Sequence, residues 1–143
     1  MAFVSVTRLH LRSKLFFPPF ALYTFRSARQ AKRSRGFRDG MLGGDGEGGA
    51  WTITAWDSEG DMRDFRSAGA HRAAMPKLLR WCDEASFTHY ESDTGALPDS
   101  AEAYRRMQSA GRLSKVNKPS PAHASGRTVS ASVPRFGLRL KRT

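Results

Sequence analysis

The sequence of 143 residues holds a single cysteine, Cys82, and only 13 acidic residues. One cysteine excludes an internal disulfide framework and any structural zinc site built on several thiolates. No apolar run approaches the roughly 18 residues that a membrane-spanning helix needs. Hydrophobic residues make up 39% and aromatic residues 10% of the chain, which is too apolar for wholesale disorder. The length excludes a doubly wound enzyme of two halves and predicts one domain with an appendage.

An apolar stretch at residues 15–25 follows two basic residues, an order that export signals also show. Pro18 and Pro19 interrupt the stretch, and no small-residue cleavage site follows before Arg26. Residues 3–9, which precede it, have the composition of a strand rather than of a charged leader. We therefore expect a cytoplasmic protein without a membrane span.

Charge and aromatic residues are placed unevenly along the chain. Lys and Arg number 24 against 13 Asp and Glu, which gives a net charge of +11. Residues 94–143 hold ten basic and two acidic side chains, whereas all three tryptophans and eight of nine phenylalanines precede Thr94. Because large apolar side chains build cores, we expect a core-forming domain at 1–93 and a C-terminal extension at 94–143.

Periodicity predicts an α+β fold for the first of these parts. Six elements are expected in the order strand, helix, strand, strand, helix, strand, at residues 3–11, 18–35, 37–42, 50–56, 58–82 and 86–91. The last helix is expected to be continuous and kinked at Pro76, since proline removes a helical hydrogen bond. This order is the ferredoxin-like βαββαβ unit, in which two helices cover one face of an antiparallel sheet.

Such a sheet leaves its second face unburied in a domain of this size. Burial against a second copy would remedy this, so a homodimer that packs sheet on sheet is predicted, forming a dimeric α+β barrel. Trp51 and Trp56 are five residues apart and point to opposite faces of one strand. One is expected in the interior and the other at the dimer face.

Few residues suggest chemistry. His71 lies on the flank of the apolar helix stripe and is the candidate catalytic base, with His89 as a weaker candidate. Cys82, Asp83 and Glu84 lie near His89 in sequence and raise the alternative of a metal site. No pair among them has the i, i+4 spacing of a zinc site, so no metal is predicted. Cys82 itself lies on the apolar stripe and is expected to be inert.

Two basic regions and one glycine-rich loop have plain structural explanations. Arg26, Arg29 and Arg33 share one face of the first helix and are expected to face solvent. The loop at residues 43–49 lacks the Gly-Lys-Ser/Thr of a phosphate-binding loop and opens a strand, so it predicts a hairpin. Nothing in either pattern requires a nucleotide.

The extension is predicted to begin with a helix at about residues 100–112 and to end in a basic, Ser/Pro-rich tail. Pro98-Asp-Ser-Ala-Glu102 has the form of a capping box. Residues 135–143 alternate partly and predict either a short strand or a disordered arm, so deletion from about Gly126 onward is expected to be tolerated. The basic tail also leaves open a nucleic-acid or anionic-surface binding module, although no RNA-binding motif accompanies it.

Five segments together resemble a known family: residues 41–46, 51–58, 62–71, 81–85 and 111–123. They look like the antibiotic biosynthesis monooxygenase superfamily of dimeric α+β barrels. The closer resemblance is to small relatives of spheroidene monooxygenase, in which a Gly-rich turn precedes a strand ending in Trp-Asp, as at Trp56-Asp57 here. This resemblance bears on fold and family more than on reaction.

The resemblance implies a ligand cavity between sheet and helices, with Trp51, Trp56, Phe65 and Met75 as pocket residues. The function it implies is a monooxygenase-type oxidoreductase that acts on, or binds, a small apolar or aromatic molecule. A non-catalytic binder is the alternative.

Cofactors stay open under this resemblance. Heme-degrading members use an Asn on the first strand and a Trp and a His on the second helix, and only His71 matches here. The first strand offers Ser5 and Thr7, and Phe65 stands near the Trp position. Because spheroidene monooxygenase contains heme, heme stays possible, with His71 or His89 as axial ligand. Other members need no cofactor and oxygenate electron-rich aromatic substrates.

Overall fold

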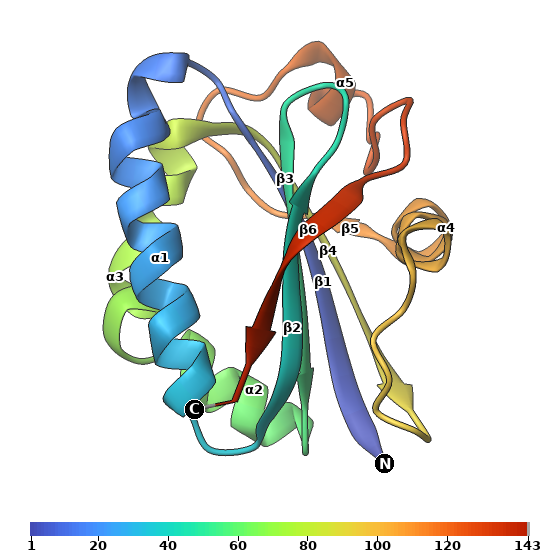
Figure 1. Ribbon diagram of the computed structural model, residues 1–143. Coiled ribbons are helices and arrows are strands. Elements are labelled where there is room, and N and C mark those ends of the chain that lie inside the picture. Colours follow the sequence, from blue (N-terminus) through green and yellow to red (C-terminus); the bar gives the residue numbers. More distant parts are fainter. Residues whose placement is uncertain (143) are drawn as a thin grey trace.

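One antiparallel sheet with helices against both faces organises the chain (Figure 1). The structure is a computed structural model and describes residues 1–142. Within them the strands are β1 (Ala2–Leu11), β2 (Phe37–Gly44), β3 (Gly49–Trp56), β4 (Cys82–Ser92), β5 (Arg112–Leu113) and β6 (Arg135–Lys141), in the order β5-β4-β1-β3-β2-β6. The helices are η1 (Lys14–Phe16), α1 (Phe17–Arg33), α2 (Glu59–Arg66), α3 (Gly69–Trp81), α4 (Ser100–Ala110) and α5 (Pro121–Ala124).

The central strands β4-β1-β3-β2 have the order of a ferredoxin-like fold, which agrees with the α+β class predicted from sequence. The register places Phe3 opposite Trp56 and Thr7 opposite Thr52. The predicted hairpin is present, because β2 and β3 pair antiparallel on either side of the glycine-rich loop. No helix among the described residues combines the length and apolarity that crossing a membrane requires.

The predicted helix at 58–82 is wrong in one respect, because two helices occupy that segment. Ser58 caps α2 as expected and accepts a hydrogen bond from the Asp61 backbone N–H. The chain then breaks before Gly69, whose positive φ of 55° starts α3, and Pro76 lies inside α3. Gln30 on α1 donates to the carbonyls of Phe65 and Ala68 and accepts from the His71 N–H, so it holds both sides of the break against α1.

The C-terminal part of the chain covers the second face of the sheet. Asp99 caps α4 as predicted by the capping box, accepting from the Glu102 N–H. Met107 of α4 is fully buried against Trp51 and Ile53 of β3. The face on which a second copy was expected to pack is thus occupied by α4 of the same chain, and the homodimer stays a prediction.

Residues 135–141 form the strand alternative of the two that the sequence left open. They pair with β2, and Leu140 is buried among Phe37, Trp56 and Ala31. The chain leading to β6 is also buried in places, at Val129 and Pro134. Deletion from Gly126 onward would therefore remove part of the sheet and core, contrary to the expectation from composition. Thr143 lies outside the described residues.

Candidate functional site

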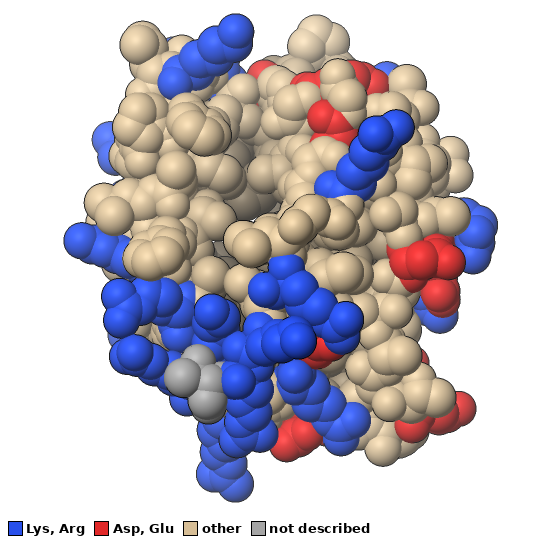
Figure 2. Space-filling view, in the orientation of Figure 1, with Lys and Arg blue, Asp and Glu red and all other residues tan. Residues whose placement is uncertain are grey.

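A cavity of about 300 Å³ lies between the sheet and the layer formed by α1, α2 and α3. Figure 2 shows the surface hollowed between α1 and the β2–β3 side of the sheet. This volume is at the lower end of the range found for small-molecule sites. The lining is mostly apolar, so the cavity suits a compact molecule with an apolar body.

Small hydroxyl side chains on the sheet leave the space for this cavity. Ser5 and Thr7 on β1 lie in register with Thr54 and Thr52 on β3, so all four point to the helix side. Valine, isoleucine and tryptophan fill the same strands on the opposite face, against α4. Where the sheet meets α1 and α3, the short side chains cannot fill the gap, and a hollow floored with hydroxyl groups results.

His71 of α3 forms part of the opposite wall and is half-buried, with its ring against Phe65 at a centroid distance of 4.8 Å. Its backbone N–H donates to Gln30 Oε1 at 2.9 Å, which anchors the start of α3 on α1. The ring Nδ1 lies 3.2 Å from the carbonyl oxygen of Arg66. A carbonyl only accepts, so the proton is assigned to Nδ1, and Nε2 keeps its lone pair.

Burial lowers the pKa of His71; the hydrogen bond to the Arg66 carbonyl opposes this effect, and the positive charge of the Arg66 side chain adds to it. The neutral imidazole is therefore favoured at neutral pH. A neutral histidine whose proton is held on Nδ1 offers Nε2 as a base. His71 thus reaches the cavity at which the sequence predicts a base.

His89 on β4 also lines the cavity, on the sheet side, where it is in register with Ser5. Its ring packs between Phe3 and Phe87, at centroid distances of 5.3 and 5.2 Å. Burial lowers the pKa of His89, and the charge of Arg66 adds to this effect. The structure thus brings both predicted histidines to one cavity from opposite sides.

The charge around the cavity is positive. Arg66 and Lys115 are among its lining residues, and none of the lining residues is acidic. Lys115 comes from the C-terminal part of the chain, and no local pattern of the sequence connects that part with the cavity. A ligand group that becomes negative would be stabilised here.

Two of the four predicted pocket residues lie elsewhere. Phe65 and Met75 line the cavity, but neither Trp51 nor Trp56 does. Trp51 faces α4, and its indole N–H donates to Asp45. Trp56 is on the cavity side of the sheet but lies behind Phe65, at a ring-centroid distance of 5.1 Å. The sequence predicts that the two tryptophans face opposite sides of the sheet, and they do. Neither lines the cavity, because Trp51 packs toward α4 and Phe65 lies between Trp56 and the cavity, and strand periodicity does not predict such packing.

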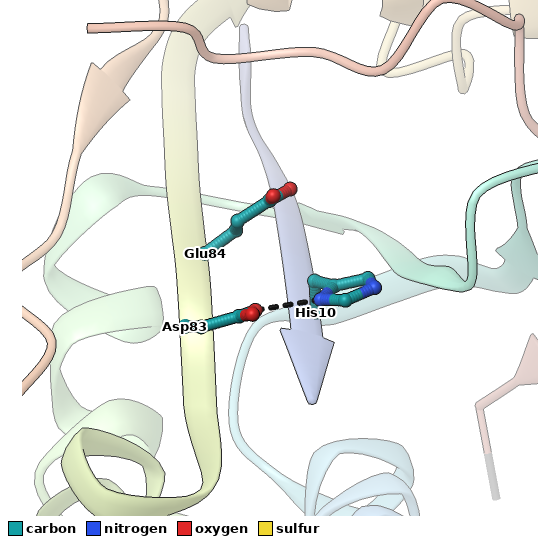
Figure 3. A group of neighbouring side chains, drawn as sticks. All are labelled: His10, Asp83 and Glu84. Carbon is teal, nitrogen blue, oxygen red and sulfur yellow. Dashed lines mark hydrogen bonds and ion pairs between the residues drawn. The ribbon is translucent and has the colours of Figure 1, made fainter. Parts of the chain in front are cut away.

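The residues weighed as metal ligands divide between two places. His89 is at the cavity, whereas Asp83 and Glu84 gather with His10 of β1, which the sequence analysis did not single out (Figure 3). His10 Nδ1 and Asp83 Oδ1 are 2.6 Å apart. Cys82 is fully buried, and burial raises the pKa of its thiol to about 12, so it is no nucleophile.

Both oxygens of Glu84 in this cluster already have partners. Arg8 Nη1 donates to one at 2.6 Å, and the Ser120 hydroxyl donates to the other at 2.7 Å. The cluster therefore acts as an ion-pair network that ties β1 and β4 to the segment around α5. Hydrogen bonds and ion pairs within the protein therefore account for the carboxylates of Asp83 and Glu84, and the cluster does not require a bound ion.

Solved structures share this fold at low sequence identity. A candidate antibiotic biosynthesis monooxygenase from Nitrosomonas europaea matches with a TM-score of 0.58 at 12% identity, over 64% of this chain and 90% of that one. SnoaB, a cofactor-independent oxygenase from Streptomyces nogalater, matches with a TM-score of 0.55 at 15% identity, over 68% and 98%. Rv0793 from Mycobacterium tuberculosis matches with a TM-score of 0.54 at 14% identity, over 64% and 95%.

No protein-family model matches the chain, and no curated protein matches it in sequence. At these identities the structural likeness establishes the fold, which is the monooxygenase-like fold that the sequence resemblance predicted. About a third of this chain lies outside the match to the Nitrosomonas structure.

Proposed function

We propose that the cavity binds a small aromatic molecule and that the protein oxygenates it without a cofactor, with His71 as the base. The observation that carries the proposal is the state of His71, a half-buried imidazole whose Nδ1 lies against the Arg66 carbonyl and whose Nε2 has no hydrogen-bond partner among residues 1–142. SnoaB, which shares the fold, is described as a cofactor-independent oxygenase, and this adds support.

The proposed substrate is a hydroxylated aromatic or its keto tautomer, which can itself reduce oxygen once deprotonated. His71 Nε2 accepts the substrate proton, and the resulting anion lies in a cavity that holds Arg66 and Lys115. The anion reacts with O2 at the carbon that is the CH2 group of the keto tautomer. One oxygen atom stays on that carbon as a carbonyl, and the other leaves as water with the second hydrogen of that carbon and the proton returned by His71, so the substrate supplies all the electrons.

Heme, which the resemblance had left open, does not fit this site well. The cavity of about 300 Å³ is small even for drug-sized ligands, and a porphyrin is larger than those. His71 and His89 both offer neutral nitrogens suited to iron. The volume between the sheet and the helices, however, is too small for the porphyrin ring. No step of the proposed reaction therefore uses heme.

Oxygen uptake with a panel of hydroxylated aromatics tests the proposal. With an accepted substrate, His71→Ala is expected to slow turnover by about 100-fold or more, because a positioned base contributes at least that much. His89→Ala, a substitution at the same cavity, serves as the matched control and is expected to weaken binding more than turnover. Thermal melts establish that both variants fold.

The pH profile gives a second readout. Because burial lowers the pKa of His71, the rate is expected to persist below the pH at which an ordinary histidine becomes protonated.

Three outcomes would contradict the proposal. Equal, negligible effects of His71→Ala and His89→Ala would show that both histidines are structural. Binding without oxygen uptake would favour a non-catalytic binder, and a Soret band in protein expressed with ample heme would contradict the cofactor-free reaction.

A further inference from the structure

We propose that the outer face of α1 docks on an anionic lipid surface. This outer face comprises Leu22, Phe25, Arg26, Arg29 and Arg33. The inference does not depend on the proposed function, because it concerns the side of α1 that faces away from the cavity.

The outer face carries large apolar side chains in contact with solvent. Leu22 and Phe25 are 46% and 60% exposed, and they are three residues apart, so they lie one above the other on the helix. Leu15 and Phe17, just before and at the start of α1, are also exposed. Single exposed apolar residues are ordinary, but Leu22 and Phe25 are neighbours on the same face of one helix and together form a small apolar surface beside its arginines.

Basic side chains continue the same face toward the C-terminal end of the helix. Arg26, Arg29 and Arg33 are exposed, and none forms an ion pair with another residue of the part that the structure describes. The guanidinium of Arg29 lies over the Phe25 ring, 5.8 Å from its centroid. Residues 17–33 contain no acidic residue, so no carboxylate within the helix neutralises them.

The positive charge extends beyond the helix. Figure 2 shows Lys and Arg gathered over the C-terminal end of α1 and the adjoining end of β6. Lys141 and Arg142, at the end of β6, are exposed. The formation of β6 therefore adds the basic end of the chain to the arginines of α1, which lie more than a hundred residues earlier in sequence.

The combination of exposed apolar side chains and arginines favours an anionic lipid surface over a second copy of the chain or a nucleic acid as the partner of this face. A second copy packed helix against helix would bring arginines against arginines, and like charges repel. Nucleic acid would satisfy the arginines but leaves the aliphatic Leu22 without a partner. An anionic membrane satisfies both, because phosphate headgroups pair with arginine while leucine and phenylalanine enter the interface.

The inner side of the same helix lines the cavity with Phe20, Tyr23 and Thr24. Docking through the outer face would hold the cavity within one helix diameter of the bilayer, where apolar molecules concentrate. The surface thus gives the cavity access to ligands that are scarce in water.

Co-sedimentation of the full chain with vesicles tests the proposal. Binding is expected to mixed phosphatidylcholine–phosphatidylglycerol vesicles and not to phosphatidylcholine alone. Substituting Arg26, Arg29 and Arg33 by Gln is expected to weaken binding by about 100-fold, since each basic residue near an anionic surface contributes severalfold. Leu22→Ser with Phe25→Ser is expected to weaken it by about tenfold or more.

A matched variant carries Gln at Arg105, Lys118 and Arg127, three exposed basic residues outside α1. It changes the net charge equally and is expected to bind like the unmodified chain. Equal losses in both charge variants would overturn the proposal, as would binding to a single-stranded oligonucleotide that needs the arginines but not Leu22 and Phe25. A stable dimer that the serine variant dissociates would assign the face to a second copy instead. All substituted side chains are exposed, and melting curves verify folding.

Discussion

Arg8 on β1 and Asp45 in the β2–β3 loop form an ion pair inside the protein, with Arg8 Nε 2.7 Å from Asp45 Oδ2 and side chains 4% and 0% exposed. The same carboxylate accepts the Trp51 indole N–H and the backbone N–H groups of Glu47 and Gly49. The glycine-rich loop is thereby closed around a buried charge. The glycine-rich loop resembles a phosphate-binding loop in sequence, but its backbone N–H groups at Glu47 and Gly49 donate to the carboxylate of Asp45.

Asp45→Ala is expected to lower the free energy of unfolding by about 3 kcal/mol, because it removes one partner of a buried pair. The matched control is Asp57→Ala, which breaks the solvent-exposed pair with Arg38 and is expected to cost about 0.5 kcal/mol. Urea denaturation measures both. Similar small losses would show that the Arg8–Asp45 pair contributes no more than a surface pair.

Acid is expected to weaken the fold through the same residue. Hydrogen bonds from Arg8 and Trp51 overcome the opposing effect of burial and lower the pKa of Asp45 from 3.8 to about 2. A lowered pKa stabilises the folded state above the ordinary value, and this contribution is lost as the pH falls toward about 2. Asp45→Asn is therefore expected to reduce the pH dependence of stability between these values, and an unchanged dependence would contradict the assignment.

Thr7→Leu is expected to abolish ligand binding at the cavity while leaving the protein folded. Thr7 belongs to the hydroxyl-bearing floor, and the larger side chain would occupy space that is empty in this structure. Thr7→Val keeps the side-chain volume and serves as the control. Calorimetric titration with an accepted aromatic ligand compares the two, and undiminished binding to the leucine variant would place the ligand elsewhere.

Leu140→Ala is expected to cost about 3 kcal/mol of unfolding free energy, as for other buried leucines. Leu138, two residues earlier on the same strand, is 57% exposed against 4% for Leu140, and Leu138→Ala is expected to change stability by less than about 0.5 kcal/mol. Chemical denaturation distinguishes them. If both substitutions were silent, the segment after Gly126 would be dispensable after all.

Much of the fold could be predicted from local pattern. The hairpin around the glycine-rich loop, the caps at Ser58 and Asp99 and the order of the first four strands, with helical segments after the first and the third, all follow from signals within a few residues. The break before Gly69 could not be predicted, because the side chain that bridges it, Gln30, lies on another helix. The strand at 135–141 was likewise ambiguous, because its pairing partner β2 lies about a hundred residues away.

Part of the candidate site could also be predicted from local pattern, and part depends on contacts between distant segments. His71 was found from helix periodicity, whereas the hydroxyl floor of Ser5, Thr7, Thr52 and Thr54 was not recognised as a site. Its signal is present in the sequence, as small polar residues at alternate positions of two strands, but it becomes a cavity only where those strands pair. His10 was missed because Asp83, its partner, is 73 positions away.

The sequence by itself determined the α+β class, the single buried thiol, the excess of positive charge and the opposite facing of Trp51 and Trp56. These depend on composition and on periods of two or 3.6 residues, which are local properties. Tertiary structure decided which tryptophan faces which layer, that α4 covers the second face of the sheet, and that the basic C-terminal end joins the arginines of α1. Each of these depends on contacts between segments far apart in the chain, and only packing brings such segments together.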